Sequence, residues 1–274
     1  MGEEQHIVSK NDVEIGRKII NSYQSRKGVF KNYTSVSKND VGMDNDIYLN
    51  YITFISAIDY AKGRKANKLW KNAKQWVEKY NWIFKPEEIK KKNVSEIMEV
   101  FNNLRLNYGD VFRVQDIGIW LTISNALNSY DGKTSYLIEC FDYDASKIYT
   151  SMNGILKKKF PFLSGDKILP MWLKTLNTDA NIHLSNMDKI PLPVDRNVAR
   201  ITYNLIFKKE FNIDVNKNII KNVRAVWTQI ANEINIPVID LDTPLWILGG
   251  EGCSRNNCKV CPNEVKIICH AIKH

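Results

Sequence analysis

Apolar residues recur along this chain with the spacing of amphipathic helices. Positions i, i+3 and i+4 are apolar in the segments 12–26, 46–62, 66–82, 94–107, 110–127, 145–158, 166–177, 195–208, 216–234 and 241–249. Segments with the strict alternation of a half-buried strand are nearly absent. The pattern therefore predicts an all-α protein.

The helical segments are separated by short turn signals rather than by long linkers. We find no repeat of solenoid length and no low-complexity stretch, which favours one two-lobed body over two tethered domains. We expect an N-terminal segment over residues 1–45 that packs on the second lobe. A first helical lobe is expected over 46–190 and a second over 191–274. Residues 28–46 are polar and are expected to form a loop.

Composition sets limits on the class of protein. The 274 residues are 44% hydrophobic and 11% aromatic, which is enough for a packed core. No run approaches the roughly 18 consecutive apolar residues of a membrane span, and the first residues are polar and mixed in charge. We therefore expect neither membrane insertion nor secretion. A net charge of +9 is compatible with a polyanionic partner such as nucleic acid.

Four of the five cysteines lie close together near the C-terminus. Cys253, Cys258, Cys261 and Cys269 follow the spacing C-x4-C-x2-C-x7-C. In this pattern the central pair can bind a metal from a tight turn, and the outer two reach it from either side. Without a secretion signal, such clustered thiols favour a metal over disulfides. The fifth cysteine, Cys140, is predicted to be a buried apolar residue.

Three metal centres are compatible with four thiolates: a [4Fe–4S] cluster, a structural zinc and a plant-type [2Fe–2S] site. Zinc ribbons usually carry two separate C-x2-C pairs, and this chain has one. In plant-type sites the fourth cysteine is more distant and the host fold is not all-helical. We expect a [4Fe–4S] cluster and keep a structural zinc as the alternative.

Several motifs follow one another in an order that resembles a known family. FPFLSGDKILPMWLKTL is followed by IPLPVDRNVARITYNLIF, and then by LWILGG and the cysteines. They are similar to the hairpin, the P-x-V-D segment and the closing loop of the helix-hairpin-helix DNA glycosylases, the endonuclease III superfamily. The resemblance extends from about Tyr48 to Cys269. It implies a two-lobed helical fold that binds damaged duplex DNA and extrudes one base.

The hairpin contains the first candidate for catalysis. Gly165 permits a turn whose N–H groups, at the start of the next helix, can hold a phosphate, so we expect Gly165 and Ser164 to contact DNA. Lys167 is expected in the first helical turn, where the helix dipole disfavours a charged amine. The resemblance implies that Lys167 is the Schiff-base nucleophile, because bifunctional family members carry lysine just after this G-x step. Lys174 is the weaker candidate.

Asp195 is the second candidate. It follows two prolines and precedes an apolar-periodic helix, so the local pattern predicts an N-cap. The resemblance implies that Asp195 is also the catalytic aspartate, whose carboxylate stabilises the oxocarbenium-like sugar and helps to activate the lysine or a water. We also expect Arg196, beside it, and Lys259, within the cysteine loop, to contact DNA.

The chain also departs from the family pattern. Leu163 stands where the hairpin L-P-G-V-G-x-K has its first glycine, and TLNTDANIHLSNMDKIP lengthens the separation between Lys167 and Asp195. That spacing and the P-x-P-V-D-x-x-V-A-R run are closer to the archaeal 8-oxoguanine glycosylases, which generally lack the cysteine loop. The expected substrate is an oxidised purine such as 8-oxoguanine, with oxidised pyrimidines next.

These features together predict a DNA-repair N-glycosylase with AP lyase activity. Its partner would be double-stranded DNA that contains a damaged base, and we expect a monomer in the cytoplasm, associated with the nucleoid. The alternative is a non-catalytic iron-sulfur protein of the same fold that binds DNA or senses damage.

Overall fold

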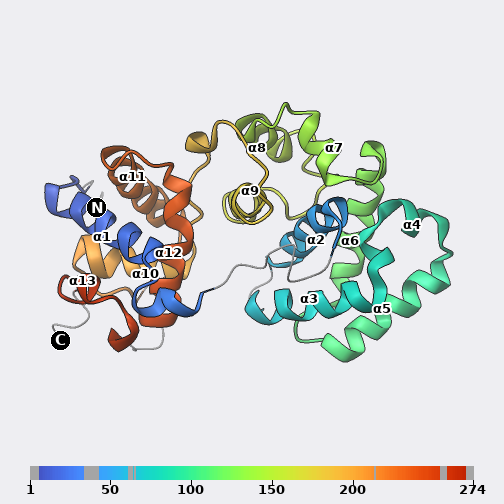
Figure 1. Ribbon diagram of the computed structural model, residues 1–274, viewed down its shortest axis with the longest axis horizontal. Helices are drawn as coiled ribbons and strands as arrows, with labels where there is room; N and C mark the ends of the chain where they lie inside the picture. Colours follow the sequence, from blue (N-terminus) through green and yellow to red (C-terminus); the bar gives the residue numbers. More distant parts are fainter. Residues whose placement is uncertain are drawn as a thin grey trace. The chain divides into compact units, whose positions relative to one another are not determined.

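The chain is helical in the parts that the computed structural model describes, which are residues 6–33, 43–60, 64, 66–212, 214–253 and 258–269. Within these ranges there is no strand (Figure 1), so the predicted all-α class is confirmed. No helix in the described ranges is both long and apolar enough to cross a bilayer.

The chain divides into two compact units. Residues 35–187 form one, here called the hairpin unit, and residues 1–34 join 188–274 in the other, here called the cysteine unit. The sequence placed the divisions after residues 45 and 190, whereas the structure has them after 34 and 187.

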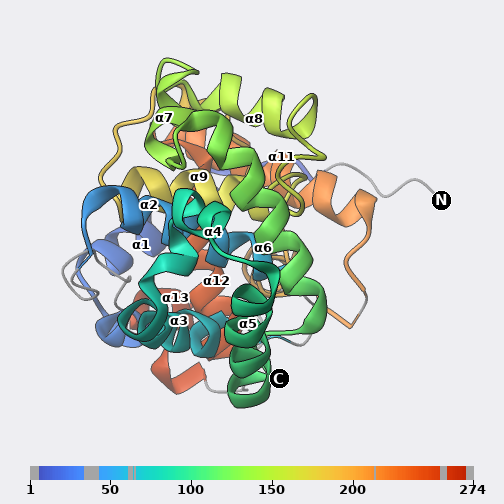
Figure 2. The same ribbon diagram turned by 90° about the vertical axis from the view of Figure 1, so that its right-hand side faces the viewer.

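The hairpin unit is built around one buried helix. Its helices are α2 (Asn45–Ile58), α3 (Ala66–Tyr80), α4 (Pro86–Lys91), α5 (Val94–Tyr108), α6 (Val114–Leu127), α7 (Thr134–Glu139), α8 (Ala145–Asn153) and α9 (Ile168–Thr178). Side chains are buried along α2 from Tyr48 to Ile58, and α2 packs against α6, α7 and α9 (Figure 2). A helix that is apolar on all sides belongs at the centre of its unit. The rings of Phe54 and Trp120 stack there with centroids 4.6 Å apart.

Asn50 is a polar residue inside this core, and its carboxamide is fully used. Its Nδ2 donates to the carbonyls of Phe84, at 3.0 Å, and Gly132, at 2.8 Å. Its Oδ1 accepts from the backbone N–H and the hydroxyl of Thr134, both at 2.9 Å. Buried polar groups are tolerated when they are satisfied in this way, and here the carboxamide joins three segments.

The cysteine unit brings the two ends of the sequence together. It contains the helices α1 (Lys10–Gln24), α10 (Arg196–Thr202), α11 (Lys217–Glu233), α12 (Asp242–Ile247) and α13 (Asn263–Lys266). Helix α1 packs against α11, α12 and α13. At Gly16, an added Cβ would collide with the Ile230 side chain, so glycine lets α1 approach α11 closely.

One local expectation needs correction. Gly28–Asn32, predicted as loop, forms a short 3-10 turn because Phe30 is buried in the core of the cysteine unit. Residues 34–42 of that expected loop lie outside the described residues, and its last two residues, Asn45 and Asp46, already belong to α2. The helical segment expected over 195–208 is confirmed, and its last turn, Tyr203–Phe207, is π-helical and ends at Lys208.

Candidate active site

The hairpin joins α8 to α9 within the hairpin unit. Asp144 caps the start of α8, with its Oδ1 accepting from the Ser146 and Lys147 N–H groups. In the turn that follows, Phe160 and Leu163 are fully buried. The two buried side chains fix the turn that precedes α9 to the core of the hairpin unit.

A bulky residue takes the left-handed conformation in this turn. Phe162 has φ +65°, a conformation that costs free energy for any residue other than glycine. Its ring stacks on Tyr60, with centroids 3.5 Å apart and planes 11° apart. The sequence comparison set Leu163 against the first glycine of the family hairpin, whereas the structure gives the glycine-like backbone to Phe162.

Gly165 provides the second left-handed residue, at φ +80°. Its N–H donates to Asn153 Oδ1 at 2.6 Å. That N–H is therefore used within the unit, because the end of α8 supplies an acceptor. Ser164 is half-buried beside it, and DNA contact by Ser164 and Gly165 stays a prediction.

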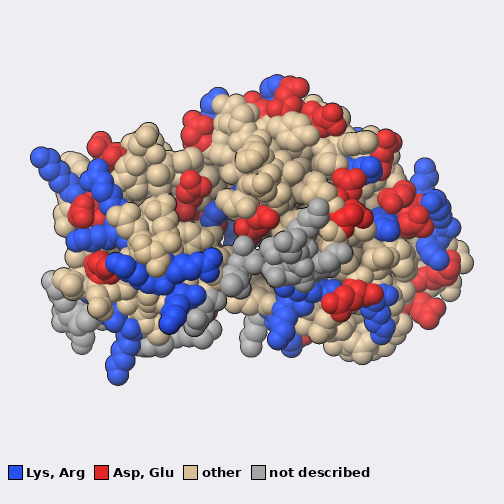
Figure 3. Space-filling view, in the orientation of Figure 1, with Lys and Arg blue, Asp and Glu red and all other residues tan. Residues whose placement is uncertain are grey.

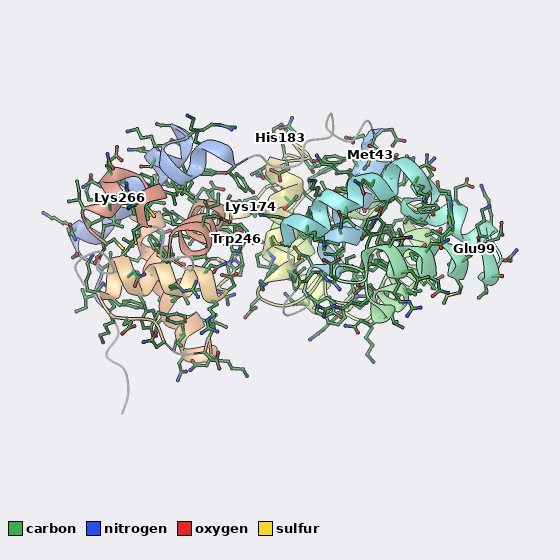
Figure 4. All side chains as sticks on the ribbon, turned by 90° about the horizontal axis from the view of Figure 1, so that it is seen from below. Met43, Glu99, Lys174, His183, Trp246 and Lys266 are labelled. Atoms are coloured by element: carbon green, nitrogen blue, oxygen red, sulfur yellow. The ribbon has the colours of Figure 1, made fainter. Side chains whose placement is uncertain are left out.

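Lys167 immediately precedes α9, in the N-cap position, and its side chain is exposed. The sequence expected it one residue further on, within the first turn. The position still sets the amine beside the positive end of the helix dipole. Lys174 lies two turns further along α9 (Figure 4) and is buried.

Asp59 and Trp70 were not singled out by their sequence pattern, yet they belong to this part of the hairpin unit. Trp70 Nε1 donates to Asp59 Oδ2 at 3.2 Å. Burial raises the pKa of the Asp59 carboxyl to about 6, although the Trp70 hydrogen bond and the charges of Lys167 and Arg64 lower it. Asp59 therefore has the altered acidity that is typical of functional groups.

Asp195 is the N-cap of α10 in the cysteine unit, as predicted. Its Oδ1 accepts from the Asn197 N–H at 2.8 Å and from the Val198 N–H at 3.0 Å. The residues before it, from Leu192 to Val194, are buried. One carboxylate oxygen is thus fixed by the helix, and the half-buried carboxylate is held in a defined orientation.

The LWILGG segment packs directly behind Asp195. At Gly249, a Cβ would collide with the Asn197 backbone carbonyl, so only glycine fits against the first turn of α10. Arg200 joins the same two elements, since its Nη1 donates to Asn197 Oδ1 at 3.1 Å and to the Gly249 carbonyl at 3.2 Å. The glycines of this motif therefore support the helix that Asp195 caps.

The four clustered cysteines are neighbours in the structure. Burial raises the pKa of Cys253 to about 11 and that of Cys261 to about 12, and negative charge on the neighbouring cysteines raises both further. Cys258 and Cys269 are among those neighbours for each. Asn204 Nδ2 donates to Cys253 Sγ at 3.3 Å. The cysteines of this group are therefore close enough for the charge of one to affect the pKa of another.

The present side-chain positions do not form a ready metal site. Among the described residues, no group of three or more Cys, His, Asp or Glu is arranged to hold a metal ion. At Gly252, an added Cβ would come within 2.5 Å of Cys261 Sγ, so glycine allows the loop to approach that thiol. Cys140 is exposed at the end of α7, and the prediction that it is buried was wrong. Leu137 and Ile138 occupy the buried face of that short helix instead.

Two basic residues were predicted to contact DNA. Arg196 is exposed at the start of α10, with Nη1 3.8 Å from Asp214 Oδ1, and Lys259 is exposed in the cysteine loop. Both belong to the cysteine unit, where the side chains visible in Figure 3 are more often basic than acidic. Their exposure leaves both side chains accessible to a polyanion.

Comparison with known families identifies the chain. A family model for AGOG, described as N-glycosylase/DNA lyase, matches residues 30–271 and so covers most of the sequence. The chain belongs to the AGOG family. No curated protein and no solved structure matches it.

Membership of the AGOG family establishes the class of reaction. The chain is a DNA-repair N-glycosylase and DNA lyase with the helix-hairpin-helix fold, and DNA is its substrate. The sequence predictions of an enzyme of this type and of this fold are confirmed. In this AGOG-family chain, Lys167 belongs to the hairpin unit and Asp195 to the cysteine unit.

Proposed function

We propose that the chain excises an oxidised purine, such as 8-oxoguanine, from duplex DNA and then cleaves the strand, with Lys167 as nucleophile. The position of Lys167 is the observation that carries this proposal. Lys167 lies at the N-terminus of α9, just after the turn at Gly165, and its side chain is exposed to solvent. The side chain makes no capping hydrogen bond to the helix. Family membership supplies the reaction that such a lysine serves.

The proposed chemistry begins with a neutral Lys167 amine. Its Nζ attacks the sugar C1′, the N-glycosidic bond breaks, and the bonding electron pair leaves with the base, which takes up a proton. Loss of a proton from nitrogen and opening of the sugar ring give the imine. Removal of a 2′ proton then expels the 3′ phosphate and cleaves the strand.

Asp195 is proposed to act on the sugar as positive charge develops at C1′. An ionised carboxylate nearby lowers the energy of an oxocarbenium-like transition state. The helix N–H groups hold one of its oxygens at 2.8 and 3.0 Å, which limits rotation of the carboxylate. Capping and catalysis are therefore compatible in Asp195.

DNA binding is proposed to use Ser164 and Gly165 from the hairpin, with Arg196 and Lys259 from the cysteine unit. The two basic side chains are exposed and would contact phosphates. A monomer acting on chromosomal DNA in the cytoplasm is the setting that we propose.

A panel of damaged duplexes tests the substrate. Duplexes with one 8-oxoguanine, one oxidised pyrimidine, one uracil or one abasic site would be incubated with the protein, and base release and strand cleavage measured separately. We expect the 8-oxoguanine duplex to react fastest and the abasic duplex to be nicked. Faster release of an oxidised pyrimidine would overturn the purine assignment, and binding without reaction on any duplex would favour a non-catalytic role.

A substitution at Asp195 separates capping from catalysis. Asparagine caps helices about as well as aspartate, so Asp195→Asn should change the unfolding free energy by less than about 0.5 kcal/mol. The loss of negative charge should slow base release about 10²-fold or more. Asp195→Ala is the control, which loses the cap as well and should unfold about 1 kcal/mol more easily. Native base release by Asp195→Asn would remove the carboxylate from the mechanism.

The four clustered cysteines are proposed to hold a [4Fe–4S] cluster, with structural zinc as the alternative. The donor set supports this, because four thiolates suit either centre and the thiols already influence one another. Basic groups are present too, since Arg200 lowers the pKa of Cys253 and Lys266 lowers that of Cys261. Binding would require the four side chains to adjust. The centre would stabilise the loop and take no part in the lysine chemistry.

Metal content provides the next prediction. Protein purified without oxygen should contain about four iron and four sulfide ions per chain and absorb visible light. Cys258→Ser and Cys261→Ser should lose the metal, whereas Cys140→Ser, which changes the exposed cysteine outside the group, should keep it. A colourless protein that contains one zinc ion would show that the site is a structural zinc site and not an iron-sulfur cluster. A metal-free protein with native stability would exclude both centres.

A further inference from the structure

Helices α2 and α9 pack in opposite directions within the hairpin unit. Near the start of α2, the Tyr48 hydroxyl donates to the carbonyl of Asp179, just beyond the end of α9, at 3.4 Å. Further along α2, Trp172 Nε1 of α9 donates to Thr53 Oγ1 at 3.1 Å. Each step toward the end of α2 therefore corresponds to a step toward the start of α9. The C-terminal end of α2 consequently lies at the end of α9 that carries Lys167.

The residues at this end of α2 confirm that register. Tyr60, two residues beyond α2, stacks on Phe162 of the hairpin with ring centroids 3.5 Å apart. Asp59, the residue that caps the C-terminus of α2, is held by Trp70 through a hydrogen bond of 3.2 Å to its Oδ2. Lys167 is close enough for its charge to lower the pKa of this carboxyl. Asp59 thus faces the lysine-bearing end of α9.

The charged and hydrogen-bonding groups around Asp59 oppose the effect of burial on its pKa. Burial dominates and raises its pKa to about 6, against the opposing effects of Trp70, Lys167 and Arg64. The guanidinium of Arg64 is itself paired with Asp116, with Nη2 2.7 Å from Oδ2. The negative charge of Asp116 partly offsets the effect of the Arg64 charge on Asp59.

The chain carries a second acidic group near the lysine, and it differs from Asp59. Asp166 directly precedes Lys167 but is exposed, and its Oδ1 accepts from the Tyr149 hydroxyl at 3.3 Å. Asp166 therefore offers a natural comparison for the half-buried Asp59.

We propose that Asp59 is a positioning residue for Lys167 and accepts the proton that the lysine must lose before it attacks C1′. In this step the N–H bond of the ammonium breaks, its electron pair stays on Nζ, and the carboxylate becomes a carboxylic acid. The step rests on the proposed role of Lys167. A rise from 3.8 to about 6 makes the carboxylate about a hundredfold better proton acceptor than an ordinary aspartate.

The pH dependence of Schiff-base formation tests this step. Borohydride trapping on an abasic duplex would be measured from pH 5 to pH 9.5 for the native chain and for Asp59→Asn, whose amide oxygen can still accept from Trp70. The native rate should rise through an inflection near pH 6, where Asp59 ionises. In Asp59→Asn the inflection should be lost, and trapping at pH 7 should be about 10²-fold slower. The difference in trapping rate between Asp59→Asn and the native chain should become smaller at high pH, because solvent then removes the proton from Lys167.

Matched variants separate proton transfer from a structural effect. Asp59→Glu should restore an inflection and part of the rate, and Asp166→Asn should behave as the native chain. Thermal unfolding identifies any variant that fails to fold, in which case the profile of Asp59→Glu decides. An inflection that survives in folded Asp59→Asn would overturn the proposal. So would faster trapping, because it would mean that Asp59 merely holds Lys167 in its charged form.

The two proposals fail in different ways. If Lys167→Gln still forms the covalent adduct, the proposed nucleophile is wrong and the role of Asp59 falls with it. If Lys167→Gln forms no adduct while Asp59→Asn traps with the native pH profile, only the role of Asp59 is lost.

Discussion

Lys167→Gln is expected to lose covalent trapping on abasic and oxidised-base duplexes by about 10³-fold or more, because glutamine has no nucleophilic amine. Glutamine has similar length, and the exposed position at the N-terminus of α9 tolerates a neutral side chain. The unfolding free energy should therefore stay close to that of the native chain. Borohydride trapping with labelled duplex, followed by gel electrophoresis, measures the adduct.

Lys174→Gln is the matched control on the same helix, and it carries the competing assignment. Lys174 is buried, so its replacement should alter stability more than Lys167→Gln does. If Lys174→Gln loses the adduct and Lys167→Gln keeps it, the nucleophile is Lys174. DNA binding by both variants, measured at one salt concentration, distinguishes lost chemistry from lost affinity.

The second large effect is expected at the buried ion pair of Arg64 and Asp116. Neither side chain is exposed, and Nη2 lies 2.7 Å from Oδ2. Arg64→Met leaves a buried carboxylate without its counter-charge, so the unfolding free energy should fall by about 3–5 kcal/mol at pH 7. Urea unfolding followed by circular dichroism measures the loss.

Two controls surround this prediction. Arg64→Met combined with Asp116→Asn removes the charge but keeps an acceptor for the Arg113 N–H, which lies 2.7 Å from Asp116 Oδ2, so much of the stability should return. Lys133→Met breaks the exposed pair with Asp46, at 3.0 Å, and should cost less than about 1 kcal/mol. A loss from Arg64→Met as small as that at Lys133 would show that the buried pair contributes little.

The pH dependence of this loss has a definite sign. Burial raises the pKa of Asp116, opposed by the Arg113 hydrogen bond and the Arg64 charge. A carboxyl with a raised pKa in the folded state binds its proton more tightly there, so its contribution to stability is present at low pH and is lost as pH rises. Without Arg64 the pKa rises further. The deficit of Arg64→Met should therefore shrink as the pH is lowered from 7 toward 4.

Local pattern predicted much of the fold because helices are local structures. The segments 66–82 and 216–234 correspond to α3 and α11, with small differences at the ends. Helices α4 and α7 were missed, since six residues make less than two turns and hold too few apolar positions to show a period. The N-cap role of Asp195 was predicted for the same local reason, because the N–H groups that donate to its carboxylate are only two and three residues further along the chain.

The sequence by itself determined the all-α class, the family and the neighbourhood of the candidate nucleophile, since periodicity and motif order are written along the chain. It also showed that four of the five cysteines lie close together near the C-terminus. Only the tertiary structure decided that Asp59 faces the start of α9, that Gly249 packs on Asn197 and that Cys140 is exposed. Such facts depend on contacts between residues far apart in sequence. The packing of α2 on α9, and of α10 on the LWILGG segment, sets those contacts, and no spacing along the chain encodes them.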